Sequence, residues 1–174
     1  TRGSVSFLGQ DLAAMSDSDL VELRRRKVGF VFQSFGLMPL LSAVENVELP
    51  LHIRGTSWPQ RHQLALETLE LVGLGPRARH RPYELSGGEQ QRVSIARALV
   101  TGPDVVFADE PTCELDTTTA MVITAILQDI AAHRGTTVIV ATHDLTLAGM
   151  ADRRVNLTDG VLSENNDTTA SASQ

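Results

Sequence analysis

The chain has 174 residues, a formal net charge of -6 and a hydrophobic fraction of 42%, which suits a globular protein with one core. The negative charge argues against nucleic acid as the main partner, and no apolar run approaches the roughly 18 residues that span a bilayer. The single cysteine, Cys113, cannot form an internal disulfide, which favours a reducing compartment.

The chain is predicted to begin with a short strand at residues 4–12 that ends in a glycine turn. A helix is expected at residues 16–27, because Ser16 and acidic residues come first and four cations come last, as the helix dipole favours. Residues 28–33 form a short run rich in β-branched and aromatic side chains, which is typical of a strand.

After a loop, two helices are expected in succession. The first covers residues 43–55 and contains Pro50, which should kink or end it. The second covers residues 57–75, with Ser57 as its N-cap, a proline in its first turn and glycine at its end.

The second half of the chain is predicted to hold two buried strands, at residues 104–111 and 136–144, on either side of a helix at 117–135. Residues 153–164 are typical of a hairpin with an Asp-Gly turn, and residues 165–174 form a polar tail predicted to be disordered. Buried strands separated by helices predict an α/β layered fold with a mostly parallel sheet.

Ligands of such sheets bind at the carboxyl ends of the strands. Four polar residues lie at or just past predicted strand ends: Gln33, Asp109, Glu110 and His143. Asp109 and Glu110 follow four apolar residues, and buried adjacent carboxylates are unfavourable unless a cation or a proton relay uses them. Asp109 could contribute to a Mg²⁺ site and Glu110 could orient an attacking water, but an acidic helix-capping pair is an equal alternative.

The segment LSGGEQ, residues 85–90, combines the capping-box pair Ser86 and Glu89 with two glycines at the start of a predicted helix. A capping box alone does not explain Gly87 and Gly88, because glycine in a helix costs about 1 kcal/mol relative to alanine. Glycines let backbone N–H groups approach a ligand closely, so this helix start is predicted to bind an anion, most simply a phosphate.

Three further polar residues have both an ordinary and a functional interpretation. Gln33 could be a strand-end hydrogen-bonding residue or a sensor of metal and water. Asp116 could simply cap the helix that begins at Thr117. A lone histidine is usually structural, but His143 is predicted at the same sheet edge as the carboxylates, which favours a phosphate contact.

Five segments in this order closely resemble the ATPase subunits of ABC (ATP-binding cassette) transporters: VFQSF, LSGGEQQR, VVFADEPT, ELD and ATHD. The resemblance implies the P-loop NTPase-like layered fold of ABC ATPase domains, with a helical subdomain at about residues 42–100 of a domain spanning 1–164. It also implies ATP and Mg²⁺ as ligands and hydrolysis of ATP to ADP and phosphate.

The resemblance implies a role for each matching position. Gln33 would belong to the Q-loop as a catalytic and metal-sensing residue, and residues 85–90 would be the signature motif, with Ser86, Gly87, Gly88 and Glu89 on the nucleotide. Asp109 would end the Walker B strand and bind the metal. The remaining positions would be a catalytic Glu110, a D-loop at Asp116 and a switch histidine at His143.

Residues 9–51 are similar to the lipoprotein-release and macrolide-export branch of this family. That similarity implies a homodimer of ATPase subunits on a membrane permease, peripheral to the cytoplasmic face of the cell membrane, with no nucleic-acid partner. The Gln33 loop and the segment after it would meet the permease.

One element of the family is missing from the sequence. The phosphate loop G-x-x-x-x-G-K-[ST] needs a lysine before a hydroxyl residue, whereas the single lysine, Lys27, follows three arginines and precedes Val28. The family places this Walker A loop upstream of the first strand. We therefore expect a truncated domain that lacks the P-loop strand and helix, exposes apolar core surface and has no ATPase activity alone.

Two alternatives remain open at this point. A soluble ABC-type ATPase of DNA repair would need a long coiled coil between Gln33 and Ser86, where the sequence shows no heptads, and translation types carry two cassettes. The other alternative is a natural non-catalytic partner that contributes only the signature helix.

Overall fold

The computed structural model describes residues 3–164. The chain divides into two compact units, Thr1–Ala141 and Thr142–Gln174. The predicted disordered tail at residues 165–174 lies outside the described residues. The predicted division into a domain at 1–164 with a helical subdomain at about 42–100 stays a prediction.

The first unit is built on a parallel sheet of three strands in the order β3-β4-β5, namely β3 (Val28–Val31), β4 (Val105–Asp109) and β5 (Thr137–Ala141). All three strands lie within the segments in which strands were predicted. Their apolar, β-branched composition suits a sheet that is buried against helices. The parallel α/β core predicted from the sequence is therefore confirmed.

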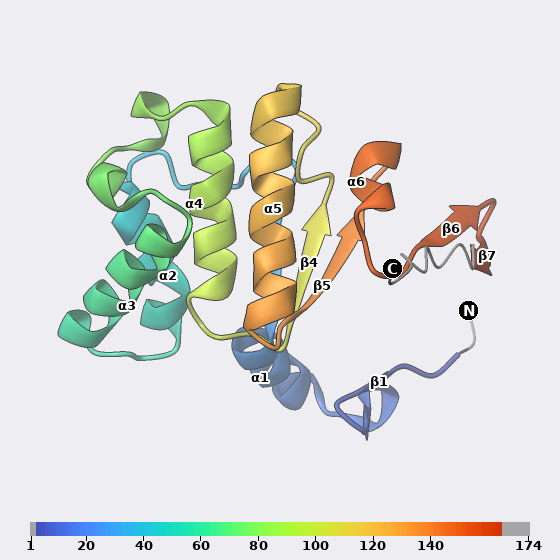
Figure 1. Cartoon of the computed structure of the whole chain (residues 1–174). Helices are drawn as coiled ribbons and strands as arrows, with labels where there is room; N and C mark the ends of the chain where they lie inside the picture. The colour runs from blue at the N-terminus through green and yellow to red at the C-terminus, as the bar shows by residue number, and fades with distance from the viewer. Residues whose placement is uncertain (1–2, 165–174) are drawn as a thin grey trace, which may run out of the picture. The chain divides into compact units, whose positions relative to one another are not determined.

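Helices cover one face of this sheet. Helix α4 (Gly87–Leu99) packs on β3, and α5 (Thr117–His133) lies beside α4 and packs on β5 (Figure 1). On this face Val31, Val106 and Ala108 of β3 and β4 are buried, and Val138 and Val140 of β5 are partly buried. Gly29 permits the close approach of α4, because a methyl group at this position would lie 2.5 Å from the Ala98 carbonyl oxygen.

The opposite face of the sheet is open in the described part of the first unit. The alternate positions Phe30, Phe107 and Ile139 are paired across the three strands. They are 45%, 38% and 48% exposed, although they are large apolar side chains. The rings of Phe30 and Phe107 stack with centroids 5.5 Å apart. This apolar row agrees with the expectation that core surface is exposed.

Helices α2 (Ala43–Ile53) and α3 (Trp58–Leu71) pack against each other and against α4. Pro50 was predicted to kink or end the first of these helices; it does not end it, since α2 continues to Ile53, and the kink stays a prediction. An interior proline destabilises a helix by about 3 kcal/mol. Val47 and Leu51, which flank the proline, are buried against the neighbouring helices, and their packing offsets this loss.

The start of α3 also differs in detail from the prediction. Ser57 occupies the N-cap position, but its side chain makes no capping hydrogen bond. The second helical residue is Pro59, which has no N–H to donate to that hydroxyl. The two helices are joined by Glu48 of α2, whose carboxylate is buried. Arg61 Nε and His62 Nδ1 of α3 lie 3.1 Å and 2.6 Å from its oxygens.

The N-terminal segment forms a small hairpin rather than the single predicted strand. Strands β1 (Ser6–Phe7) and β2 (Gln10–Asp11) pair antiparallel. They precede the short 3₁₀ helix η1 (Leu12–Ala14) and helix α1 (Asp17–Lys27). Ser16 caps α1 as predicted, by accepting a hydrogen bond from the amide of Asp19.

Two further 3₁₀ turns, η2 (Gly75–Arg77) and η3 (Pro82–Glu84), lead into α4. The second unit contains α6 (Leu145–Gly149), which was not predicted, and the predicted hairpin of β6 (Val155–Thr158) and β7 (Val161–Glu164). Both turn residues, Asp159 and Gly160, have positive φ, as an Asp-Gly turn requires. No described helix is long and apolar enough to span a bilayer.

Candidate functional site

The signature helix α4 begins with a complete capping box. The amide of Ser86 donates to Glu89 Oε2 at 2.8 Å, and the amide of Glu89 donates to Ser86 Oγ at 3.3 Å. The hydrogen bond from the Ser86 amide is the main cause that lowers the pKa of the Glu89 carboxyl. Ser86 is exposed at the start of the helix, where the helix dipole favours an anion.

The two signature glycines have different surroundings. Gly87 is half-buried, and a methyl group there would meet Leu115 at 3.6 Å, an ordinary contact. Gly88 is buried, and a methyl group there would lie 2.2 Å from Thr119 Cγ2 at the start of α5. The sequence assigned both glycines to close approach by a ligand. The structure gives Gly88 an additional reason, which is close packing of α4 on α5.

The end of β4 holds the adjacent carboxylates Asp109 and Glu110. The side chain of Asp109 is exposed at the sheet edge. Glu110 has a φ of 44°, in the left-handed region that non-glycine residues rarely adopt. Its amide donates to the carbonyl of Ala141 at the end of β5, at 2.9 Å. The carboxylate pair is therefore located at the carboxyl edge of the sheet, as predicted.

Gln33 follows β3 at the same edge. Val31 pairs with Ala108, so Gln33 and Asp109 both lie where their parallel strands end. The side chains of both residues are exposed. Their oxygen donors fit Mg²⁺, which prefers one or two protein oxygens and completes its shell with water and phosphate. The described residues contain no group of three His, Cys, Asp or Glu side chains able to hold a metal.

Asp116 caps α5, which agrees with the ordinary interpretation of this residue. Its two carboxylate oxygens accept hydrogen bonds from the amide and the hydroxyl of Thr119, at 3.0 Å and 2.6 Å. These bonds, with that of the hydroxyl first, lower the pKa of Asp116. The residue thus orients Thr119, the side chain that lies against Gly88.

His143 lies two residues beyond the end of β5 and belongs to the second compact unit. The structure thus groups Gln33, Asp109 and Glu110 at one sheet edge, whereas the predicted role of His143 stays a prediction.

Two residues of α4 that the sequence did not single out contact the turns after Glu110 and Gln33. Gln91 is fully buried and donates through Nε2 to the carbonyl of Pro111 at 2.8 Å. Arg97 donates through Nη2 to the carbonyl of Phe35 at 2.9 Å and through Nη1 to that of Gly36. A sequence signal existed only for Gln91, which is a polar residue on the apolar face of an amphipathic helix.

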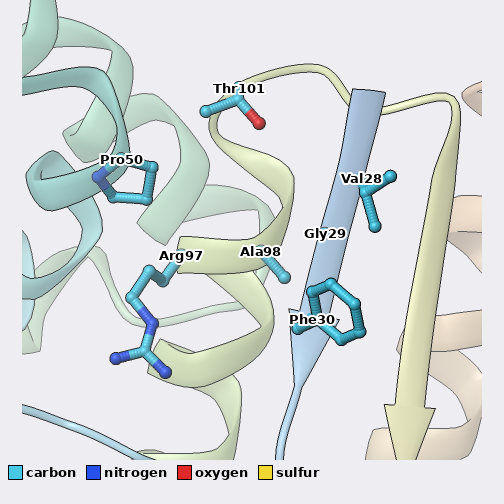
Figure 2. A pocket seen from close by; sticks show the side chains of 7 residues that line it. All are labelled: Val28, Gly29, Phe30, Pro50, Arg97, Ala98 and Thr101. Atoms are coloured by element: carbon cyan, nitrogen blue, oxygen red, sulfur yellow. The ribbon is translucent and has the colours of Figure 1, made fainter. Parts of the chain in front are cut away.

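Figure 2 shows the C-terminal part of α4 beside β3, where a small hollow of about 120 Å³ lies between the helix and the strand. Ala98 faces Gly29 there, and the Arg97 side chain extends along the helix away from Thr101. Burial lowers the pKa of Arg97.

Comparison with known proteins identifies the family to which this chain belongs. The family model described as "ABC transporter" matches residues 1–113. The chain is 50% identical over 162 residues to the ABC transporter ATP-binding protein YbbA of Escherichia coli K12, covering 93% of this chain and 71% of that protein. It is 46% identical to the lipoprotein-releasing system ATP-binding protein LolD of Alcanivorax borkumensis, with the same coverage of both chains.

Two further similarities agree. The chain is 45% identical to the macrolide export ATP-binding/permease protein MacB of Marinobacter nauticus, covering 93% of this chain and 25% of that protein. The solved ATP-binding cassette MJ0796, described as a dimer bound to ADP and Pi, superposes with a TM-score of 0.81 at 42% identity. The superposition covers 94% of this chain and 74% of that one. The fold predicted from the sequence is therefore confirmed, and the chain belongs to the ABC transporter family as an ATP-binding protein of the kind that includes LolD and MacB.

Proposed function

We propose that the chain acts as part of the ATPase that drives a membrane permease of the lipoprotein-release or macrolide-export type. The observation that carries this proposal is the presence of two candidate sites in the first compact unit. The capped start of α4 at Ser86 offers amides to a phosphate, and the edge of the sheet offers Asp109 and Glu110. The transporter names of the relatives favour this function over an ATPase of repair or translation.

In this proposal two cassettes form a homodimer around ATP, as the relative MJ0796 is dimeric. Ser86, Gly87, Gly88 and Glu89 of one subunit, together with Asp116, lie against a nucleotide bound by the other subunit. The amides of α4 and the hydroxyl of Ser86 stabilise charge on the γ-phosphate in the transition state.

The sheet edge supplies further chemistry, because Glu110 accepts a hydrogen bond from the attacking water and orients it. His143, which matches the family's switch histidine, contacts the γ-phosphate in this proposal. Asp109 and Gln33 would hold Mg²⁺, which neutralises phosphate charge when it is bound. Gln33 and the loop after it face the permease, which keeps the protein peripheral to the cytoplasmic face of the membrane.

The printed sequence contains no G-x-x-x-x-G-K-[ST] loop, so we expect no hydrolysis by this chain alone. ATP binding and hydrolysis should be measured on the 174-residue chain and on a chain extended upstream to include such a loop. The extended chain should hydrolyse ATP and dimerise with it. Turnover by the 174-residue chain itself would contradict the expected inactivity, and an inactive extended chain would contradict the proposed function.

A further inference from the structure

Helix α4 contacts the turns that follow both Gln33 and Glu110. Each turn contains a non-glycine residue in the left-handed region, Phe35 with a φ of 56° and Glu110 with a φ of 44°. Such conformations are unfavourable by about 1–3 kcal/mol each and persist only where surrounding contacts hold them. The contacts that hold these two turns come from the same helix.

The turn after Glu110 is held by Gln91. Pro111 is fully buried, so an unpaired carbonyl there would be strongly unfavourable, and Gln91 Nε2 donates to it at 2.8 Å. Two backbone bonds complete the arrangement, from the amide of Glu110 to Ala141 and from the amide of Cys113 to the carbonyl of Glu110. The backbone conformation at Glu110 is therefore supported by the hydrogen bond that Gln91 makes to the next residue.

The turn after Gln33 is held by Arg97. Both ends of its guanidinium group donate to consecutive carbonyls. The carbonyl of Phe35 is 62 residues away in sequence and that of Gly36 is 61 residues away. Phe35 and Gly36 both have positive φ, which directs their carbonyl oxygens to the same cation. Charge-assisted bonds of this kind are about twice as strong as neutral ones.

We infer that Gln91 and Arg97 are positioning residues, through which α4 sets the catalytic turns of its own subunit: Gln91 sets the turn of Glu110, and Arg97 sets the turn of Gln33. This inference rests on the proposed function for its link to hydrolysis. In the proposed dimer the first turn of α4 would face a nucleotide held by the partner subunit, while Gln91 and Arg97 of the same helix hold two turns of their own subunit.

Hydrogen–deuterium exchange on the 174-residue chain tests the two contacts separately. The variants are Gln91→Met and Arg97→Met, which keep much of the side-chain volume. Reporter amides are those of Phe35 and Gly36 in one turn and of Cys113 and Leu115 in the other, all hydrogen-bonded in the structure. The controls are the exposed positions Gln60→Met, in α3, and Arg79→Lys, in the turn after η2.

Arg97→Met should raise exchange in residues 34–37 by about tenfold or more and leave residues 112–115 unchanged, and Gln91→Met should do the reverse. Arg97→Lys should restore protection in part, because one donor remains. Equal increases throughout the sheet and helices would indicate general destabilisation and overturn the inference, as would unchanged exchange in both turns.

The link to hydrolysis is tested in the extended chain that carries the nucleotide loop. Both variants should lower kcat by about tenfold or more with KM for ATP nearly unchanged, since the two residues do not contact nucleotide. An equal loss in KM would contradict positioning. An inactive parent chain would refute the proposed function, whereas the exchange result would still decide whether Gln91 and Arg97 hold these turns.

Discussion

Gly88 of the signature helix lies against Thr119 at the start of α5, so closely that a methyl group at position 88 would lie 2.2 Å from Thr119 Cγ2. Thr119 cannot simply rotate away, because its hydroxyl donates to Asp116 at 2.6 Å. The D-loop residue, the start of α5 and the second signature glycine are thus in contact within one subunit. The conformation of Asp116 is thereby linked to the helix start that we propose to contact the partner's nucleotide.

Gly88→Ala should destabilise the chain by about 1–3 kcal/mol, because the added methyl group overpacks the contact with Thr119. Gly87→Ala should not destabilise the chain and should stabilise it by up to about 1 kcal/mol, since its nearest contact would be ordinary and alanine favours a helix. Urea unfolding measures both values. Thr119→Ser removes Cγ2 and keeps the hydroxyl, so it should recover most of the loss in the Gly88→Ala background. No recovery would mean that another contact requires glycine.

Helix α2, like α4, begins with a capping box, in which Ser42 pairs with Glu45. Stability should fall in acid because of these two capping boxes. The amides of Ser42 and Ser86 hold the pKa values of Glu45 and Glu89 below the ordinary 4.5. A carboxyl whose folded pKa is lowered stabilises the fold fully above its unfolded pKa, and this stabilisation is lost as the pH falls through the folded value. Stability should therefore be constant near pH 7 and decline below about pH 4.5.

Unfolding of Glu89→Gln and Glu45→Gln as a function of pH checks this prediction. Each variant should be less stable at pH 7 and show a shallower decline in acid. Glu67→Gln, an exposed helical carboxylate outside both capping boxes, is the control and should keep the parent slope. Identical slopes in all four proteins would place the acid sensitivity elsewhere.

Glu110→Gln should abolish turnover without abolishing ATP binding, if Glu110 orients the attacking water. In the extended chain we expect kcat to fall by about 10²–10⁴-fold, as for loss of a general base. The ATP-bound dimer should accumulate, which size-exclusion chromatography with ATP detects. Glu114→Gln, four residues along and exposed, is the matched control. Normal turnover in Glu110→Gln would refute the role of Glu110.

The apolar row Phe30, Phe107 and Ile139 should make the 174-residue chain bind hydrophobic dyes and self-associate as its concentration rises. Phe107→Thr and Ile139→Thr should lower dye fluorescence by about half, since each removes a large part of the open face. Met121→Gln alters a 59% exposed apolar side chain on α5 and should have little effect. The dye signal of the extended chain should also be low if added segments cover this face.

The sequence alone determined the parts of this protein that depend on neighbours a few residues apart. The capping box of Ser86 and Glu89, the cap at Asp116 and the Asp-Gly hairpin all rest on bonds between residues close in sequence. The strand that ends at Asp109 could also be predicted from the sequence, because a buried parallel strand is apolar on both faces. The order of these motifs was enough to indicate the family.

Only the tertiary structure decided the features that depend on distant residues. Helix α2 continues past Pro50 because packing outweighs its local preference, and Gly88 is required by Thr119, which lies in another helix. The bonds of Gln91 to Pro111 and of Arg97 to Phe35 join residues 20 and 62 positions apart. A local pattern carries no trace of such contacts, because they form only when sheet and helices bring separate segments together.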